Sequence, residues 1–172
     1  MEMAKFDRTP ESSHMKTKLY ATSIIVIVLD QITKWLANTR LTLHDPVPVM
    51  PSFNLTLMYN KGAAFSFLST AGGWQRWFFT IVAAVISVVL IVWIARLRPH
   101  EKWLGAGLAL VLGGAIGNLI DRLYLGYVID FVQWFYGSFY WPAFNIADAA
   151  ISAGTVILLF TSFFPGSEEG KR

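Results

Sequence analysis

Residues 77–95 read WFFTIVAAVISVVLIVWIA, nineteen positions without a charged side chain. A helix needs roughly 20 apolar residues to cross the ~30 Å hydrocarbon core of a bilayer, so this stretch predicts a membrane-spanning helix. The composition of all 172 residues agrees, because 55% are hydrophobic and only 15% are charged, whereas soluble domains carry about 25% charge. The chain is therefore not an ordinary soluble protein. Its hydrophobic content also excludes a disordered chain.

Three further stretches are candidates for membrane spans, namely residues 19–36, 103–120 and 144–164. The second of these has no charged residue and the third has only Asp148. With residues 77–95 they predict an all-α membrane protein with four transmembrane helices.

The first stretch allows a second interpretation. Lys16 and Lys18 precede its uncharged part, residues 19–29, which is only 11 residues long. A basic start and a short apolar segment are typical of a cleaved signal peptide. Asp30 and Lys34 near its end, and the lack of a small-residue cleavage site, favour a retained span instead.

Lysine and arginine are unevenly distributed over the connections between the spans. With four spans both chain ends share one side, and that side has nine basic residues: Lys5, Arg8, Lys16, Lys18, Arg96, Arg98, Lys102, Lys171 and Arg172. The opposite side has four, over more residues: Arg40, Lys61, Arg76 and Arg122. Because cytoplasmic loops are the basic ones, both termini are predicted to be cytoplasmic. We expect residues 1–15 to be disordered, 16–165 to form one transmembrane domain, and 166–172 to be a polar cytoplasmic tail.

The two outward connections are too apolar to be solvated linkers. In residues 46–68, Phe53, Leu55, Leu57 and Tyr59 alternate with Asn54, Thr56, Met58 and Asn60. This period of two predicts a strand with one apolar face. Residues 126–144 are aromatic and β-prone, and are interrupted by Gly137 and Pro142. We therefore predict a small sheet that lies on the outer leaflet.

An ionisable residue at membrane depth costs about 2.5–3.5 kcal/mol on insertion scales, so each one invites a functional hypothesis. Asp30 and Lys34 are four residues apart on one helical face and can pair. They act either as a structural clamp or directly in chemistry. Asp121 lies on another face of the third span and is expected to have a structural partner.

The third span contains small residues at intervals of four, which predict close helix packing in lipid: Gly105, Ala109, Gly113 and Gly117. A neighbouring row contains Gly114, Asn118 and Arg122. Arg122 either holds a carbonyl or a lipid headgroup, or extends its charged end to the membrane surface.

Two further aspartates follow in the chain. Asn145 and Asp148 fit the N-cap and third position of the last helix, where an acid is favourable. Asp130 lies among apolar neighbours in YVIDF and has no base nearby in sequence. Two converging carboxylates can share a proton, so that one activates water and the other polarises a carbonyl. The chain has no cysteine and only three distant histidines, so neither a cysteine nucleophile nor a histidine metal site is expected.

Five segments occur in the same order as in a known family: LDQITK (29–34), YNKGAAFSFL (59–68), GGAIGNLIDR (113–122), YVIDF (127–131) and FNIAD (144–148). Together they resemble the lipoprotein signal peptidases (signal peptidase II), over residues 18 to 164. The resemblance implies four transmembrane helices with a small extracytoplasmic β-cradle and a short amphipathic segment. It also implies a bacterial inner-membrane aspartyl protease, active near the periplasmic face, that cuts prolipoproteins just before a diacylglyceryl-modified cysteine.

The same resemblance implies roles for residues. Asp130 and Asp148 fall on the family's catalytic pair. The sequence leaves open which of the two is the base; because a helix N-terminus favours a charged carboxylate, one hypothesis is that Asp148 is the base and Asp130 the acid. The substrate-binding or supporting residues are Asn60, Gly62, Asn118, Arg122 and Asn145. Asp30, Lys34 and Asp121 are assigned structural roles. We expect a monomer that contacts prolipoproteins and membrane lipids, with no cofactor, metal or nucleic-acid partner.

Three other functions are alternatives to a lipoprotein signal peptidase. A membrane scaffold would use the same polar residues only to join helices. A transporter would need polar groups along a path across the bilayer, but residues 77–95 offer only Thr80 and Ser87. An acyltransferase would need a histidine beside an acid, and His100 lies in a cytoplasmic loop.

Overall fold

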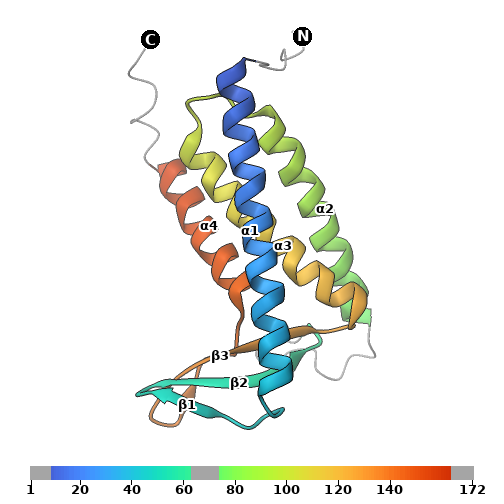
Figure 1. The fold of residues 1–172 in the computed structure, drawn as a ribbon, viewed down its shortest axis with the longest axis vertical. Helices are drawn as coiled ribbons and strands as arrows, with labels where there is room; N and C mark the ends of the chain where they lie inside the picture. Colours follow the sequence, from blue (N-terminus) through green and yellow to red (C-terminus); the bar gives the residue numbers. More distant parts are fainter. Residues whose placement is uncertain (1–8, 63–73, 164–172) are drawn as a thin grey trace.

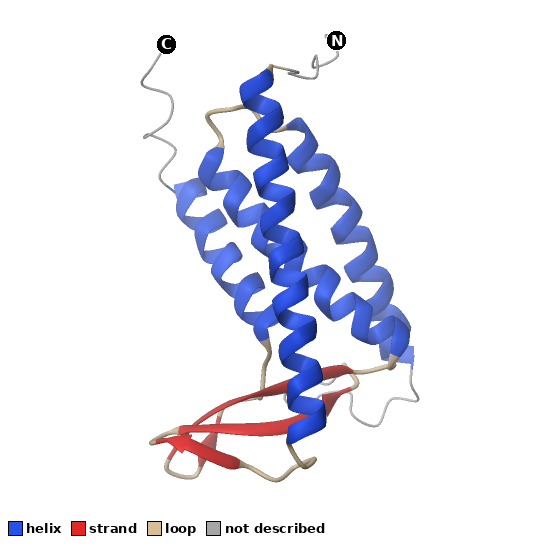
Figure 2. Cartoon of the chain, viewed as in Figure 1, coloured by secondary structure: helices blue, strands red, loops and turns tan. Residues whose placement is uncertain are grey.

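The computed structural model describes residues 9–62 and 74–163, which form a bundle of long helices with a small sheet at one end (Figures 1 and 2). The helices are α1 (Pro10–Arg40), α2 (Trp74–Arg96), α3 (Lys102–Tyr124) and α4 (Ile146–Phe163). Among the described residues, these four are long and apolar enough to cross a membrane. The predicted spans and the predominantly helical fold are confirmed. The expected amphipathic segment has no counterpart among the described elements, and residues 63–73 lie outside them.

Helix α1 begins earlier than the sequence indicated. Thr9 is its N-cap and accepts a hydrogen bond from the backbone nitrogen of Ser12 at 3.3 Å. Pro10 at the first helical position and Glu11 in the first turn also favour a helix start here. Residues 10–15, which we expected to be disordered, are therefore helical, and that part of the prediction was wrong. Residues 1–8 and the proposed tail, 166–172, lie outside the described residues.

Helix α3 is the most buried of the four helices, and its small residues explain how closely its neighbours approach. A Cβ added to Gly105 would lie 2.6 Å from Leu19 Cδ1, and one added to Gly113 would lie 2.8 Å from the carbonyl oxygen of Ser23. Ser23 Oγ also donates to the carbonyl oxygen of Ala109 at 2.8 Å. The predicted packing row on α3 is thus confirmed as the contact with α1.

The apolar core lies at the end of the bundle away from the sheet and consists of Leu19, Leu90, Ile94, Leu97, Leu108, Ala109 and Leu112. The outer face of α2 is apolar but uncovered, and Ile81, Val85 and Val88 are each about 60% exposed. Such a face is stable in lipid and not in water. The bundle is therefore that of a multi-pass membrane protein.

The sheet has four antiparallel strands in the order β1-β2-β3-β4. Their bounds are β1 Val47–Met50, β2 Phe53–Asn60, β3 Val128–Tyr136 and β4 Phe139–Tyr140. The two central strands, β2 and β3, come from the two predicted outer segments and pair so that Met58 lies opposite Asp130. Gly137, with φ +58°, forms the turn between β3 and β4. The predicted β element is confirmed.

The buried residues of β2 include polar ones. Asn54 and Thr56 are each only 5% exposed, whereas Phe53, Leu55 and Tyr59 are half-buried. A register shift between Leu55 and Met58 interrupts the alternation. The hydroxyl of Thr56 donates to Gln133 Oε1 on β3 at 2.9 Å, so the polar side is satisfied by the neighbouring strand. The predicted strand is present, and the predicted alternation of apolar and polar residues is interrupted within it.

Candidate functional site

The ten residues given a catalytic, binding, supporting or structural polar role from the sequence lie where α1, α3 and α4 meet the sheet (Figure 1). Two come from α1, one from the end of β2 and one from the residues just after β2, and the rest from α3, β3 and the start of α4. The ten are Asp30, Lys34, Asn60, Gly62, Asn118, Asp121, Arg122, Asp130, Asn145 and Asp148. Residues from four distant parts of the chain thus form one continuous network.

Asp148 lies in the first turn of α4, where the local sequence fixes its position. Its backbone nitrogen donates to Asn145 Oδ1 at 2.9 Å, and its Oδ2 accepts from the backbone nitrogen of Asn145 at 3.2 Å. This reciprocal pair is a capping box, and the predicted N-cap is confirmed. Asp148 Oδ1 also accepts from Asn118 Nδ2 at 2.8 Å. These donors and the helix N-terminus stabilise a negative charge on this carboxylate.

Asp130 is in a different environment. It lies on β3, is 2% exposed, and accepts hydrogen bonds from Asn145 Nδ2 at 2.7 Å and Asn60 Nδ2 at 3.0 Å. Burial is the larger cause and the charge of Asp148 the second; against the opposing hydrogen bonds from the two asparagines, they raise the pKa of Asp130 to about 7. Near neutral pH this carboxyl can therefore hold a proton.

Asn145 joins the two carboxylates. It is fully buried, its side chain donates to Asp130, and its backbone nitrogen donates to Asp148. The preceding residue, Phe144, pairs with Val132 on β3 through two backbone hydrogen bonds of 2.9 and 3.0 Å. Strand β3 and the start of α4 are thus held together on either side of the aspartates.

Asn60 has its amide orientation fixed by the backbone of Gly62. The nitrogen of Gly62 donates to Asn60 Oδ1 at 2.9 Å, so the NH₂ group of Asn60 faces Asp130. Gly62 has φ +100°, and a Cβ there would lie 2.7 Å from Phe79 Cδ2. A larger residue at position 62 would be strained and would clash.

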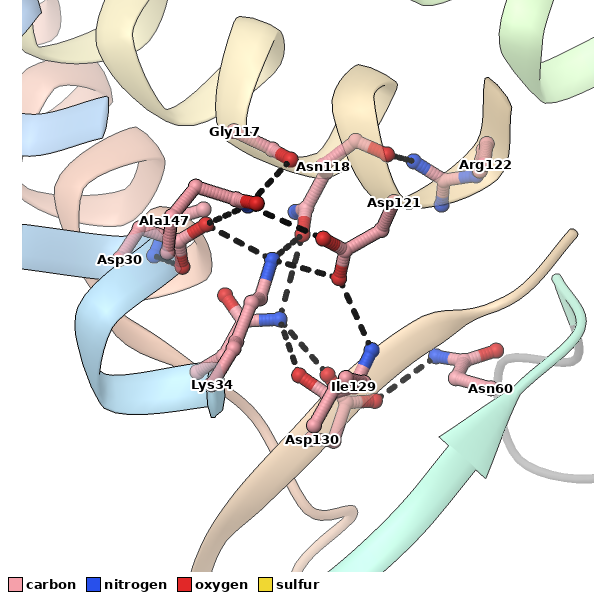
Figure 3. Close-up of polar contacts among 12 residues, drawn as sticks. Asp30, Lys34, Asn60, Gly117, Asn118, Asp121, Arg122, Ile129, Asp130 and Ala147 are labelled. Carbon is pink, nitrogen blue, oxygen red and sulfur yellow. Dashed lines mark hydrogen bonds and ion pairs between the residues drawn. The ribbon is translucent and has the colours of Figure 1, made fainter. Parts of the chain in front are cut away.

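Arg122 extends from the end of α3 next to the sheet toward the site (Figure 3). Its Nη1 donates to the carbonyl oxygen of Asn118 at 3.3 Å, and its guanidinium carbon lies 5.6 Å from the ring centre of Phe79. The charges of Asp148, Asp130 and Asp121 act on this half-buried group. Its role, either to hold a carbonyl or a lipid headgroup or to extend its charge to the membrane surface, stays a prediction.

Lys34 is buried among polar groups, as Figure 3 shows. Its Nζ lies 2.8 Å from Asp30 Oδ2, so the predicted pairing of these residues is confirmed. It also lies 3.0 Å from Asp121 Oδ2 and 2.9 Å from Asn118 Oδ1. Asp121 is therefore held by a cation from another helix, and its Oδ2 also accepts from the backbone nitrogen of Ile129 at 3.0 Å.

Two residues of this region were missed in the sequence. Gln31 Nε2 lies 3.0 Å from Asp121 Oδ1 and 3.2 Å from both Asp30 Oδ2 and the carbonyl oxygen of Gly117. Arg76 at the start of α2 donates to the last carbonyls of α3, those of Arg122 and Leu123. Gln31 had a signal, because it lies inside the LDQITK segment at the depth of Asp30. In the sequence, Arg76 contributed only to the number of basic residues on the less basic side of the predicted membrane.

The arrangement provides two carboxylates in unequal environments, one favouring the charged form and one favouring the protonated form. Such a pair can remove a proton from water and polarise a carbonyl in one step. Within residues 9–62 and 74–163, no three His, Cys, Asp or Glu side chains are grouped as metal ligands.

Comparison with known sequences gives one consistent result. Residues 22–164 match the family model described as signal peptidase (SPase) II. A lipoprotein signal peptidase of Acinetobacter baumannii is 55% identical over 142 residues, which are 83% of this chain and 81% of that protein. One from Teredinibacter turnerae is 55% identical over 148 residues, covering 86% of this chain and 88% of that protein.

Comparison with solved structures agrees with the fold. A bacterial membrane enzyme solved at 2.3 Å superposes with a TM-score of 0.77 at 27% identity, covering 91% of this chain and 93% of that one. A second, solved at 1.9 Å, has a TM-score of 0.71 at 28% identity, covering 94% and 97%.

Proposed function

Because this chain belongs to the signal peptidase II family of lipoprotein signal peptidases, which are aspartic peptidases, we propose that it hydrolyses the peptide bond just before the diacylglyceryl-modified cysteine of prolipoproteins. The proposed catalytic residues are Asp130 and Asp148. The observation that supports them most is that Asn145 contacts both carboxylates while only Asp130 is fully buried.

In the proposed reaction Asp148 accepts a proton from a water molecule, and the water oxygen attacks the scissile carbonyl carbon. Protonated Asp130 donates its proton to the carbonyl oxygen as that oxygen becomes negative. The tetrahedral intermediate then breaks its C–N bond. Asp148 transfers the proton to the leaving nitrogen, which belongs to the lipidated cysteine, and Asp130 recovers its own proton from the product carbonyl.

The neighbouring polar residues would orient the substrate. Arg122 has donors beyond the one that Asn118 accepts, and a guanidinium is suited to hold peptide carbonyls. Asn60 is held beside Asp130 by Gly62 and would keep that carboxyl in place as the substrate enters. The diacylglyceryl chains would stay in lipid, where they give binding energy remote from the chemistry.

We further propose that the protein is a monomer in the bacterial inner membrane, in contact with its lipids, with the sheet and the aspartates at the periplasmic face. The start of α1 and the end of α4 lie together at the opposite end of the bundle (Figure 1). The turn with Arg96, Arg98 and Lys102 lies at that end as well. This distribution of basic residues supports placing that end in the cytoplasm.

The test is cleavage of a purified prolipoprotein by the purified protein in detergent, with a chelator present. The lipidated precursor is expected to be cut before its cysteine, and the same precursor without the diacylglyceryl group is expected to be cut far more slowly. Mass spectrometry of both products locates the bond. Failure to cut the lipidated precursor, or equal cleavage of both precursors, would contradict the proposed substrate.

The same assay gives a prediction for pH. The value of kcat/KM is expected to fall as pH rises through about 7, because Asp130 must be protonated and burial raises its pKa to about 7. The profile reports the coupled pair of aspartates and not Asp130 alone. In Asn60→Ala the alkaline limb moves to higher pH, because the hydrogen bond from Asn60 lowers the pKa of Asp130. A profile that stays flat through neutral pH would contradict the assignment.

A further inference from the structure

Lys34 uses all three of its N–H groups on partners from two helices. Its Nζ lies within 3.0 Å of Asp30 Oδ2, Asn118 Oδ1 and Asp121 Oδ2. An ammonium has three donors, so this set is complete. The side chain is 2% exposed, and neither water nor substrate is needed to satisfy it. We call Lys34, Asp30, Asp121 and Asn118 the lysine cluster.

Each carboxylate of the lysine cluster also holds a backbone N–H beside one of the proposed catalytic aspartates. Asp30 Oδ1 accepts from the nitrogen of Ala147 at 2.9 Å, one residue before Asp148. Asp121 Oδ2 accepts from the nitrogen of Ile129 at 3.0 Å, one residue before Asp130. Figure 3 shows both connections around Lys34. The ammonium therefore fixes the carboxylates that anchor β3 and α4.

Asn118, the third partner of Lys34, donates a hydrogen bond directly to the carboxylate of Asp148. Lys34 Nζ donates a hydrogen bond to Asn118 Oδ1, and Asn145 Nδ2 donates to the same oxygen at 3.2 Å. The NH₂ group of Asn118 is consequently turned toward Asp148 Oδ1 at 2.8 Å. Removing the ammonium leaves this oxygen with only the longer hydrogen bond from Asn145, at 3.2 Å. The amide is then held less firmly with its NH₂ group toward Asp148.

From this geometry we propose that Lys34 is a positioning residue for the reaction: through Asp30, Asp121 and Asn118 it sets where the carboxyls of Asp130 and Asp148 lie relative to each other. This proposal rests on the catalytic pair proposed above. It differs from a role in stability, because a buried ion cluster commonly contributes little net stability compared with apolar residues of similar size. What the cluster does provide is a fixed geometry, on which catalysis depends steeply.

The first experiment replaces Lys34 with methionine, which keeps much of the length and removes the donors. Turnover is measured per folded molecule, with folding checked by thermal melting and gel filtration in detergent. We expect kcat to fall on the order of 100-fold with KM little changed, since a displacement of about 1 Å can have this effect. The matched control is Lys18→Met, the same change at an exposed position of the same helix, for which we expect wild-type kcat.

A purely structural role for Lys34 gives a different result. In that case Lys34→Met lowers the melting temperature or the yield of folded protein, while each folded molecule retains wild-type kcat. That outcome would overturn the proposal.

A second variant covers the case in which Lys34→Met does not fold because two carboxylates are left without a cation. The triple variant Asp30→Asn, Lys34→Met, Asp121→Asn removes all three charges and keeps an oxygen for Ala147 and for Ile129. Replacing a whole buried ion cluster is often neutral for stability. A folded triple variant with kcat lowered at least tenfold at unchanged KM supports the proposal, whereas wild-type kcat in it refutes the proposal.

Asp130→Asn and Asp148→Asn are measured beside these variants. If either variant retains turnover, the proposed catalytic pair is wrong, and the proposed role of Lys34 is then wrong as well. If both are inactive while folded Lys34→Met has wild-type kcat, only the positioning role is wrong.

Discussion

Asp130→Asn is expected to leave a folded protein that does not cleave prolipoprotein. Asparagine has nearly the same shape, but its amide N–H is far too weakly acidic to protonate the carbonyl oxygen of the scissile bond. Its amide group also meets the NH₂ groups of Asn145 and Asn60, both of which now donate to the carboxylate. Loss of a general acid commonly costs about 10²–10⁴-fold in rate, and we expect the upper part of that range.

The partner variant, Asp148→Asn, is expected to be equally inactive, because the water then has no base. The pair acts as a unit, so the double variant should be no slower than either single one. Rates are measured with the lipidated precursor, and folding is checked by thermal melting.

The matched control for this prediction is Asp45→Asn, which removes an exposed carboxylate from the outer connection between α1 and β1. It is expected to turn over at the wild-type rate. Turnover by folded Asp130→Asn within tenfold of wild type would refute the proposed acid, whatever the result at Asp148.

Most of the fold could be predicted from local sequence, because hydrophobic length decides which segments enter a membrane. The four helices and the strand at Phe53–Asn60 follow from runs of apolar residues and from alternation. The start of α1 at Pro10 does not follow from these two signals. It depends on the cap formed by Thr9, Pro10 and Glu11, which outweighs the polarity of the residues that follow. Capping is a local signal, so this helix start could have been predicted from the sequence.

The contacts within the site depend on packing and register, which sequence alone does not give. Asn60 reaches Asp130 only because β2 and β3 pair in a shifted register. Lys34 reaches Asp121 only because small residues on α3 let α1 approach closely. The pairing of Asp30 with Lys34 was predictable because it is local to one helix. The residues of the site were therefore predictable, while their partners across elements were not.

The close approach of α3 and α4 is a second place where packing determines the geometry of the site. Gly114 lies on α3 directly opposite the carbonyl oxygen of Ala147, the residue before Asp148. A Cβ on residue 114 would overlap that oxygen and would lie 2.7 Å from Ile151 Cγ1. Backbone atoms cannot give way as a flexible side chain can, so the first turn of α4 would have to move.

Gly114→Ala is therefore expected to reduce activity far more than a single methyl group normally does. Overpacking of this kind costs about 1–3 kcal/mol of stability, and a shift of about 1 Å in Asp148 is expected to lower kcat on the order of 100-fold. The control is Ala153→Val, which adds bulk to the exposed face of α4 and should change neither quantity appreciably. Wild-type kcat and melting temperature in Gly114→Ala would show that α4 can move away without disturbing the carboxylates, and that their geometry is set by β3 and the lysine cluster alone.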